Sequence, residues 1–187
     1  MCLNNENLFY IIEVNTIHSN RSTMKRIAVC GSNITDSSHV IKISEEIGEE
    51  IAKRNDILVC GGLGGVMEAA ARGCKKLNGV TVGILPSSDK SSANDYIDIP
   101  LPTSLGKFRN FLIVNSVDGV IAIEGKWGTL SEISMSLNLG IVTILIRNTG
   151  GVVDWLCKNP IMFDKMSYLI ADSAQKAIDL LYSSLEK

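Results

Sequence analysis

Three short segments rich in glycine and small polar residues offer the groups best suited to binding an anion. The first is Gly31-Ser32-Asn33, the second runs from Cys60 through Gly61, Gly62, Gly64 and Gly65 to Met67, and the third is Glu124-Gly125-Lys126-Trp127-Gly128-Thr129. Glycine permits positive φ and leaves backbone N–H groups uncovered, and the dipole of a following helix favours an anion. The segments therefore predict a phosphate site. For each segment taken singly, a tight strand-to-helix turn without a ligand is an equally good explanation.

The spacing of these glycines excludes two common nucleotide sites. No Gly-Lys-Ser or Gly-Lys-Thr sequence follows any of them, so none forms the phosphate loop of an ATP-hydrolysing protein. The glycines after Cys60 do not match the dinucleotide fingerprint G-x-G-x-x-G in register. The sequence therefore disfavours ATP hydrolysis and dinucleotide binding.

Arg109 and Glu132 are the charged side chains whose positions suggest chemistry, yet each also has a structural explanation. The run Thr129-Leu130-Ser131-Glu132 has the spacing of a capping box, in which Thr129 caps a helix and Glu132 accepts from the cap residue's N–H. Arg109 lies among apolar residues of a helical segment, where an arginine commonly lays its stem on the protein surface. Taken alone, neither residue requires a ligand.

The cysteines and histidines do not form a recognisable metal site. The five cysteines are Cys2, Cys30, Cys60, Cys74 and Cys157, with no CxxC pair among them, which predicts reduced thiols. Cys30 and Cys60 each end a predicted strand, so a redox or soft-metal pair at the ligand edge is one interpretation and the filling of tight buried space is the favoured one. His18 and His39 have no partner at ligand spacing, so no metal site is expected.

Alternating strands and helices must position these residues. Short apolar runs predict strands at residues 26–30, 57–60, 80–85, 117–123 and 141–146, and helical segments are predicted at residues 37–53, 66–77, 104–114, 130–139 and 173–185, the last capped by Asp172 or Ser173. The pattern predicts an α/β fold, a Rossmann-like three-layer αβα arrangement with a mostly parallel sheet. Ligands of such sheets bind at the carboxyl ends of the strands, where the three segments lie. Residues 86–102, which include a short extended stretch at residues 96–99, are predicted to form a rim over this site. Asp118 is interpreted as a structural turn residue.

Length and composition fit one globular domain. We assign residues 24–187 to a single Rossmann-like domain and residues 1–23 to an N-terminal extension of unknown role. The net charge of -2 provides no field that would attract a nucleic acid. The apolar stretches are far shorter than the roughly 20 residues that cross a bilayer. With no secretory signal in residues 1–23, the expected location is the cytoplasm.

The order of several motifs resembles a known family. Arg109-Asn110, Asp118 and Gly128-Thr129-Leu130-Ser131-Glu132 occur with the spacing of the Lonely Guy family of phosphoribohydrolases, formerly misnamed lysine decarboxylases, in the SLOG superfamily. The likeness spans residues 25–146, and the stretch from Gly61 to Met67 is similar to that family's first glycine loop. Gly83-Ile84-Leu85-Pro86, Asp98-Ile99-Pro100 and the run from Trp127 to Glu132 most resemble the branch that contains the molybdenum cofactor carrier proteins.

The resemblance implies a set of site residues. Arg109 and Glu132 would flank the N-glycosidic bond of a nucleoside 5'-monophosphate, where a carboxylate stabilises oxocarbenium-like charge and activates water. Gly128 and Thr129 would contact the phosphate. The full expected binding set, from the sheet-edge argument and the resemblance together, is Gly31, Ser32, Gly61, Gly62, Gly64, Gly65, Met67, Gly125, Lys126, Gly128 and Thr129.

Two departures from the hydrolase pattern weigh against inherited catalysis. Glu124 stands where the family has proline, and Lys126 stands where it has its second glycine. A carboxylate near a phosphate is repulsive unless it is paired, whereas a lysine adds positive charge or occupies ligand space. We therefore place a carrier of a phosphorylated ligand, either a nucleoside monophosphate or a molybdopterin-type cofactor, slightly ahead of a phosphoribohydrolase. A sensor or scaffold is a third alternative.

The resemblance also implies self-association. The apolar segments 105–114 and 130–139 are suited to pairing between subunits in a homo-oligomer, a dimer or a tetramer. The expected partners are thus a small phosphorylated ligand and copies of the same chain, with no membrane and no nucleic acid among them.

Overall fold

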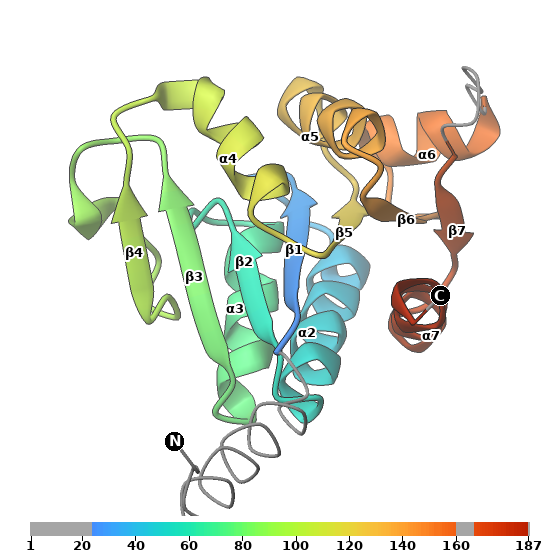
Figure 1. Cartoon of the computed structure of the whole chain (residues 1–187), viewed down its shortest axis with the longest axis horizontal. Coiled ribbons are helices and arrows are strands. Elements are labelled where there is room, and N and C mark those ends of the chain that lie inside the picture. The colour runs from blue at the N-terminus through green and yellow to red at the C-terminus, as the bar shows by residue number, and fades with distance from the viewer. Residues whose placement is uncertain (1–23, 160–166, 187) are drawn as a thin grey trace, which may run out of the picture.

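A parallel sheet of seven strands forms the centre of the molecule (Figure 1). The computed structural model describes residues 24–159 and 167–186. The strands lie in the order β4-β3-β2-β1-β5-β6-β7, and every neighbouring pair is parallel. Their bounds are β1 (Arg26–Gly31), β2 (Ile57–Cys60), β3 (Val80–Leu85), β4 (Ile99–Pro102), β5 (Gly119–Ile123), β6 (Val142–Ile146) and β7 (Leu169–Ala171). The predicted Rossmann-like fold is confirmed, with a sheet that is entirely parallel.

Helices cover both faces of this sheet, as three-layer packing requires. One face is covered by α2 (Ser38–Lys53), α3 (Val66–Lys76) and α7 (Ala174–Leu185). The other face is covered by α4 (Arg109–Asn115), α5 (Trp127–Asn138) and α6 (Gly151–Lys158). The largest apolar cluster lies beneath α2, α3 and α7, and two smaller clusters lie beneath the shorter helices of the second layer.

The sequence missed three elements that have weak local signals. β4 contains Pro100 and Pro102, which cannot donate to a ladder, and it persists because it is an edge strand. β7 has only three residues, and α6 follows the Gly150-Gly151 pair. The predicted helix 104–114 is divided into a 3-10 turn, η2 (Gly106–Phe108), and α4, while a second 3-10 turn, η1 (Lys90–Ser92), lies in the predicted rim.

Several helix ends and turns match their predicted chemistry. The Ser173 side chain accepts a hydrogen bond from the N–H of Lys176 and so caps α7, as predicted. Asp118 accepts from the backbone N–H of Arg26 at 2.8 Å and pairs with its guanidinium, which joins the starts of β5 and β1. Its structural role is thereby confirmed.

Cys30 and Cys60 do not form a pair. Cys30 belongs to the apolar cluster beneath α4, whereas Cys60 belongs to the cluster beneath α2 and α3. Because strand side chains alternate between the faces of a sheet, the two thiols point to opposite sides. The alternative of a redox or soft-metal pair is therefore wrong.

The strand order fixes where a ligand can bind. The chain winds outward from β1 to β4 and then returns to add β5, β6 and β7 on the other side of β1. The order therefore reverses between β1 and β5, and a crevice opens at the carboxyl ends of these strands. The loops after β1 and β5 border this crevice.

Candidate functional site

A cavity of about 420 Å³ lies at the predicted crevice. Its lining residues come from the loops after β1 and β2 and from the starts of α3, α4 and α5. They are Gly31, Ser32, Asn33, Ile34, Leu63, Met67, Lys107, Arg109, Asn110, Lys126, Gly128, Thr129 and Glu132. The volume lies in the usual range for a small-molecule site.

Arg109 and Glu132 meet at the base of the cavity. Both side chains are more than nine-tenths buried, and Nη1 of Arg109 lies 3.7 Å from Oε1 of Glu132. That separation makes an ion pair but is too long for a hydrogen bond. Nη1 has no hydrogen-bond partner, although it is buried. The interpretation of Arg109 as a surface side chain is therefore wrong, because α4 turns it inward.

The surroundings of Glu132 favour its protonated form. Burial raises the pKa of Glu132 to about 7, against the opposing effects of the Arg109 charge and a hydrogen bond with the Cys30 thiol. Burial, with the nearby Glu132 carboxyl adding to the effect, holds the pKa of Cys30 well above its usual range. The site thus contains a carboxyl that exchanges its proton near neutral pH and a thiol that stays protonated.

The predicted capping box is wrong. Helix α5 begins three residues earlier than expected, at Trp127, with Lys126 as its N-cap, and the N–H of Leu130 donates to the carbonyl of Lys126 at 2.9 Å. Thr129 is therefore inside the first turn, and Glu132 points to Arg109 instead of back to the cap. No side chain caps α5, which leaves the N–H groups of its first turn without a side-chain acceptor, and Gly128 and Thr129 of this turn line the cavity.

The glycine segment after β2 departs most from expectation, because several of its backbone N–H groups already donate to protein acceptors. The N–H of Gly62 donates to Sγ of Cys60 at 3.3 Å, and the N–H of Gly64 donates to Oδ1 of Asn33 at 2.9 Å. The first N–H of α3, from Val66, donates to the carbonyl of Ser32 at 2.9 Å. Gly61, Gly62, Gly64 and Gly65 consequently lie outside the cavity lining, where only Leu63 and Met67 represent this segment.

These glycines instead make room for neighbouring groups. A Cβ on Gly61 would lie 2.2 Å from Nη2 of Arg109, and one on Gly65 would lie 2.3 Å from the carbonyl oxygen of Ser32. Gly125 is also outside the lining, and its Cβ would lie 2.2 Å from Oγ1 of Thr129. The tight-turn interpretation therefore accounts for these positions, and Gly61 in particular provides the space that the Arg109 guanidinium occupies.

Glu124 does not pair with Lys126. One of its carboxylate oxygens accepts from Oγ1 of Thr35 at 3.3 Å, and its backbone N–H donates to Oγ1 of Thr149 at 2.9 Å. The other oxygen, Oε2, is buried without a hydrogen-bond partner. Glu124 has φ 55°, which proline cannot adopt. The departure from the hydrolase pattern thus accompanies a different backbone conformation.

Two lysines and three apolar side chains complete the wall of the cavity. The ammonium groups of Lys107 and Lys126 make no hydrogen bond or ion pair with any residue in the described ranges. Ile34, Leu63 and Met67 supply apolar surface. An anionic group and a flat ring can therefore be accommodated in one cavity.

Sequence reasoning did not include five of the lining residues in the binding set: Asn33, Ile34, Leu63, Lys107 and Asn110. Asn33 and Asn110 belong to motifs that the sequence analysis considered. Lys107 belongs to no motif, and its position depends on the 3-10 turn η2, which replaces the start of the predicted helix. Nδ2 of Asn110 donates to the carbonyl of Gly128 and to Oγ of Ser131, which joins α4 to the start of α5.

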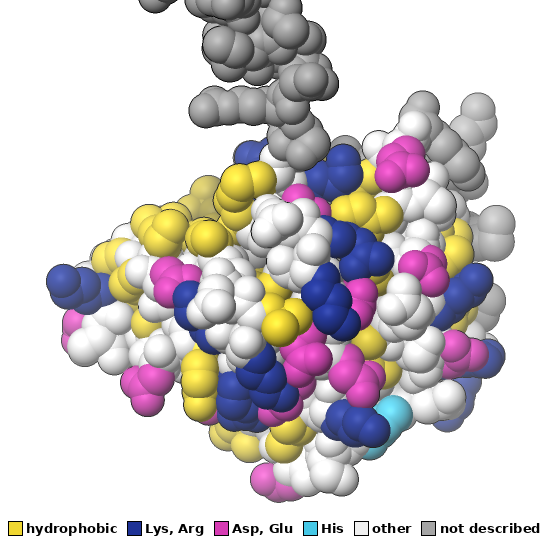
Figure 2. Space-filling model, turned by 90° about the horizontal axis from the view of Figure 1, so that it is seen from below, with side chains coloured by type: hydrophobic (Ala, Val, Ile, Leu, Met, Phe, Trp, Pro, Cys, Tyr) yellow, Lys and Arg dark blue, Asp and Glu magenta, His cyan; other side chains and the backbone are white. Residues whose placement is uncertain are grey.

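The described residues contain neither a metal-binding cluster nor a membrane-spanning helix. In residues 24–159 and 167–186, no group of three or more His, Cys, Asp and Glu side chains is arranged to hold a metal ion. Within the same ranges, every helix is too short or too polar to cross a membrane. Figure 2 shows one face of the molecule, on which Lys and Arg side chains are interspersed with Asp and Glu.

Comparison with known proteins supports the fold and the resemblance. A family model described as the SLOG cluster4 family matches residues 24–178. The molybdenum cofactor binding protein from Rippkaea orientalis is 34% identical, with a TM-score of 0.79 over 88% of this chain and 99% of that one. The molybdenum cofactor carrier protein from Chlamydomonas reinhardtii is 27% identical, with a TM-score of 0.74 over 88% and 100%. An uncharacterized protein of Archaeoglobus fulgidus is 42% identical over 117 residues, 63% of this chain and 76% of that protein.

Proposed function

The chain belongs to the SLOG cluster4 family, and from this premise we propose that it is a carrier that binds a small phosphorylated ligand in the cavity between β1 and β5. The observation that carries the proposal is the guanidinium of Arg109. It is buried at the base of the cavity, and its Nη1 has no hydrogen-bond partner. A buried charged donor without a partner is costly unless a ligand supplies the acceptor.

The charge around Arg109 indicates an anion. Lys107 and Lys126 contribute two further positive charges at the cavity wall, and neither is neutralised by a described acidic side chain. The uncapped first turn of α5 adds backbone N–H groups beside Gly128 and Thr129. A phosphate group satisfies all of these donors together.

The rest of the cavity fits the ring of such a ligand. Leu63 and Met67 form an apolar wall next to the cationic groups, and the volume of about 420 Å³ suits a nucleoside monophosphate or a pterin phosphate. The relatives from Rippkaea and Chlamydomonas are named for binding or carrying the molybdenum cofactor. We therefore favour a molybdopterin-type ligand, with phosphate at Arg109 and Lys126 and the ring against Leu63 and Met67.

Native mass spectrometry of the purified protein tests this proposal. The expected result is a copurifying phosphorylated ligand, or stoichiometric binding after addition of AMP or a molybdopterin preparation. Lys126→Met and Arg109→Met should each weaken binding by at least about tenfold, since a hydrogen bond to a charged group contributes about 1.5–3 kcal/mol. Lys90→Met, a lysine of η1 outside the cavity lining, is the matched control. Binding that is insensitive to Arg109 and Lys126 would exclude this cavity.

A second candidate function is hydrolysis of a nucleoside 5'-monophosphate to free base and ribose 5-phosphate. It is favoured by one observation, the buried pair of Arg109 and Glu132 with the pKa of Glu132 near 7. In this reaction water supplies the hydroxyl group on ribose and the proton on the base, and Glu132 in its ionised form accepts a proton from that water. Arg109 holds the phosphate or assists the departing base.

Incubation with AMP and other nucleoside monophosphates separates the two functions. Release of free base that is abolished by Glu132→Gln would establish the hydrolase. Tight binding without base release, retained in Glu132→Gln, would establish the carrier. The conformation of Glu124 and the presence of Lys126 support the second outcome, because both alter the turn that precedes the catalytic helix.

We further propose that the protein works as a cytoplasmic homo-oligomer, with residues 24–187 as a single domain. Residues 1–23, the predicted extension, lie outside the described residues. Cys30, Cys60, Cys74 and Cys157 are all free thiols, which supports a reducing compartment. The apolar side chains exposed on η2 and α4, among them Phe108 and Phe111, support a contact between subunits.

A further inference from the structure

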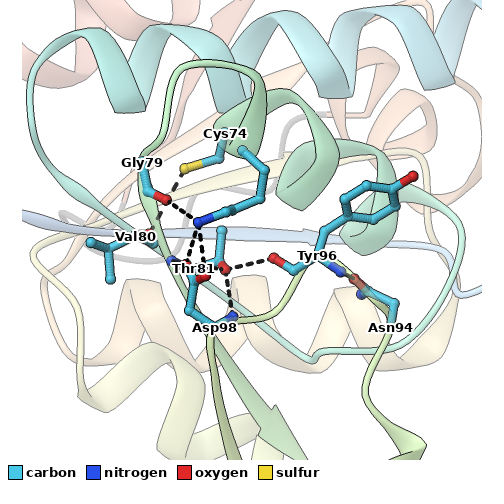
Figure 3. Close-up of polar contacts among 8 residues, drawn as sticks. Cys74, Gly79, Val80, Thr81, Asn94, Tyr96 and Asp98 are labelled. Atoms are coloured by element: carbon cyan, nitrogen blue, oxygen red, sulfur yellow. Dashed lines mark hydrogen bonds and ion pairs between the residues drawn. The ribbon is translucent and has the colours of Figure 1, made fainter.

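A short segment between η1 and β4, residues 94–98, connects the glycine segment of the site to the body of the sheet. Figure 3 shows Asn94, Tyr96 and Asp98 of this segment with Thr81 of β3. We call residues 94–98 the strap. It contacts β3 at Thr81 and Gly83 and forms no helix or strand of its own. The sequence predicted only a rim here, and the proposed ligand contacts do not use any of its residues.

The end of the strap is held firmly by Asp98. Its carboxylate accepts two hydrogen bonds from Nζ of Lys75, at 2.7 and 2.9 Å, and one from the backbone N–H of Thr81 at 3.0 Å. The hydroxyl of Thr81 donates to the carbonyl of Tyr96 at 2.6 Å, and the N–H of Asp98 donates back to the same hydroxyl. Burial acts to raise the pKa of Asp98, but the bonds from Lys75 and Thr81 together outweigh it and lower the pKa, so the anchor stays charged at neutral pH.

The start of the strap is Asn94, and it contacts the glycine segment directly. Its backbone N–H donates to the carbonyl of Gly62 at 2.9 Å, and its side-chain Nδ2 donates to the carbonyl of Leu63 at 2.7 Å. Its Oδ1 accepts from the N–H of Tyr96 at 3.1 Å, which fixes the orientation of the amide. Asn94 thus donates one hydrogen bond to each of two consecutive carbonyls, those of Gly62 and Leu63.

The opposite side of the glycine segment is held by Asn33. The N–H of Gly64 donates to Oδ1 of Asn33, so the segment is braced between Asn94 on one side and Asn33 on the other. Leu63 and Asn33 both line the cavity, whereas Asn94 does not. A displacement of the Leu63 carbonyl would therefore move the Leu63 side chain and, through the bond between Gly64 and Asn33, the Asn33 side chain, both of which line the cavity.

We infer that Asn94 is a positioning residue that sets the ring-binding wall of the cavity through Leu63. The inference rests on the proposed function, because it concerns the same ligand site. Asn94 bonds to Gly62 and Leu63 and to none of Arg109, Lys126 and the first turn of α5. Arg109 packs against the glycine segment at Gly61, where Asn94 makes no bond. The ring wall at Leu63 should therefore depend on the Asn94 side chain more than the phosphate subsite does. Loss of the Asn94 side-chain donor should then weaken binding of the ring and leave binding of the phosphate unchanged.

The test compares AMP with ribose 5-phosphate, which has the phosphate and sugar but no ring. Asn94→Asp keeps the acceptor for Tyr96 and replaces the donor with an oxygen that faces the Leu63 carbonyl. We expect the Kd of AMP to rise about five- to tenfold in this variant, the equivalent of one net hydrogen bond, and the Kd of ribose 5-phosphate to stay within about twofold. Asn159→Asp is the matched control, since Nδ2 of Asn159 also donates to a carbonyl, that of Trp155, at 2.9 Å.

Equal weakening of both probes, or of neither, would overturn the inference, because a general loss of stability does not distinguish the ring from the phosphate. Hydrogen exchange of residues 61–65 gives a readout that needs no ligand. Faster exchange in Asn94→Asp than in Asn159→Asp is expected, and unchanged exchange would overturn the positioning role. If the wild-type protein bound neither probe, the proposed ligand class would fail, and the exchange measurement would still decide the role of Asn94.

Discussion

The Arg109 and Glu132 pair is expensive to bury and incompletely satisfied. Nη1 of Arg109 lies 3.7 Å from Oε1 of Glu132, and this Nη1 makes no hydrogen bond. Removal of both groups from water costs several kcal/mol per ion, and a pair without good hydrogen bonds recovers only part of it. A ligand that supplies the missing acceptor would offset this cost. The pair is therefore better explained by binding than by stability of the fold.

The pKa of Glu132 predicts a pH dependence of anion binding. At pH values below about 7 the carboxyl is protonated, so it neither repels an anion nor competes for Arg109; above about 7 it does both. Sulfate keeps a constant charge over this range and is a suitable probe. We expect sulfate to bind about tenfold more weakly at pH 8 than at pH 6, by titration calorimetry. In Glu132→Gln the affinity should be independent of pH, and a flat profile in the wild-type protein would contradict the assigned environment.

Gly61 should be coupled energetically to Arg109. The three atoms nearest to a Cβ at position 61 all belong to the Arg109 guanidinium, the closest at 2.2 Å. We expect Gly61→Ala to lower the free energy of unfolding by about 1–3 kcal/mol through overpacking. In an Arg109→Ala background the same substitution should cost at least about 1 kcal/mol less. Urea denaturation of the four proteins measures this difference, and additive effects would show that Gly61 does not make space for Arg109.

At the scale of elements, helices α2 and α3 pack with their backbones in contact. A Cβ on Gly48 of α2 would lie 2.0 Å from the carbonyl oxygen of Ala70, and one on Gly73 of α3 would lie 2.0 Å from that of Glu45. Arg72 and Lys76 of α3 both form ion pairs with Glu45 across this contact. Such partly exposed pairs contribute little, and the absence of a Cβ at the two glycines is what permits the close approach.

Helix propensity and packing predict opposite effects for Gly73→Ala. Propensity alone predicts stabilisation by about 1 kcal/mol. The clash of a Cβ at position 73 with the carbonyl oxygen of Glu45 predicts destabilisation by about 1–3 kcal/mol. This effect should dominate, because a backbone oxygen inside a helix cannot move aside easily. Gly128→Ala, in the first turn of α5, is the control, since its Cβ would have no neighbour closer than 3.8 Å. Thermal unfolding should show a lower Tm for Gly73→Ala only; a higher Tm for both would refute the packing argument.

At the scale of the whole molecule, the two layers of helices are unequal. The layer of α2, α3 and α7 covers the larger apolar cluster, while the second layer includes α4, a helix of seven residues. Phe108 is 84% exposed, and Leu105, Phe111 and Leu112 nearby are also exposed. A patch of this kind on one side of a protein is typical of a contact with another subunit.

Phe108→Asp should therefore disrupt the proposed homo-oligomer. Because the side chain is mostly exposed in the single chain, the substitution should change the free energy of unfolding of the monomer by less than about 0.5 kcal/mol. Size-exclusion chromatography with light scattering should show a smaller assembly. Leu77→Asp, at the end of α3 on the other face, should leave the mass unchanged. A monomeric wild-type protein, or an unchanged mass in Phe108→Asp, would contradict the proposed interface.

Periodic apolar patterns along the chain were sufficient to predict most of the fold. Five strands, the long helices and the N-cap at Ser173 are local features, because each depends on residues within a few positions of one another. The elements that were missed, β4, β7 and α6, are short and gain their stability from neighbours that are distant in sequence. Local propensity cannot report such contacts.

The sequence by itself determined the Rossmann-like fold and the sheet edge that holds the site. Through the resemblance to a family, the sequence also predicted that Arg109 and Glu132 belong to one site. Only the tertiary structure decided that Glu132 faces Arg109 instead of a helix cap, and that Gly62 and Gly64 use their N–H groups on Cys60 and Asn33. The physical reason is that a backbone N–H donates once, and whether it is free for a ligand depends on which loop lies beside it in space.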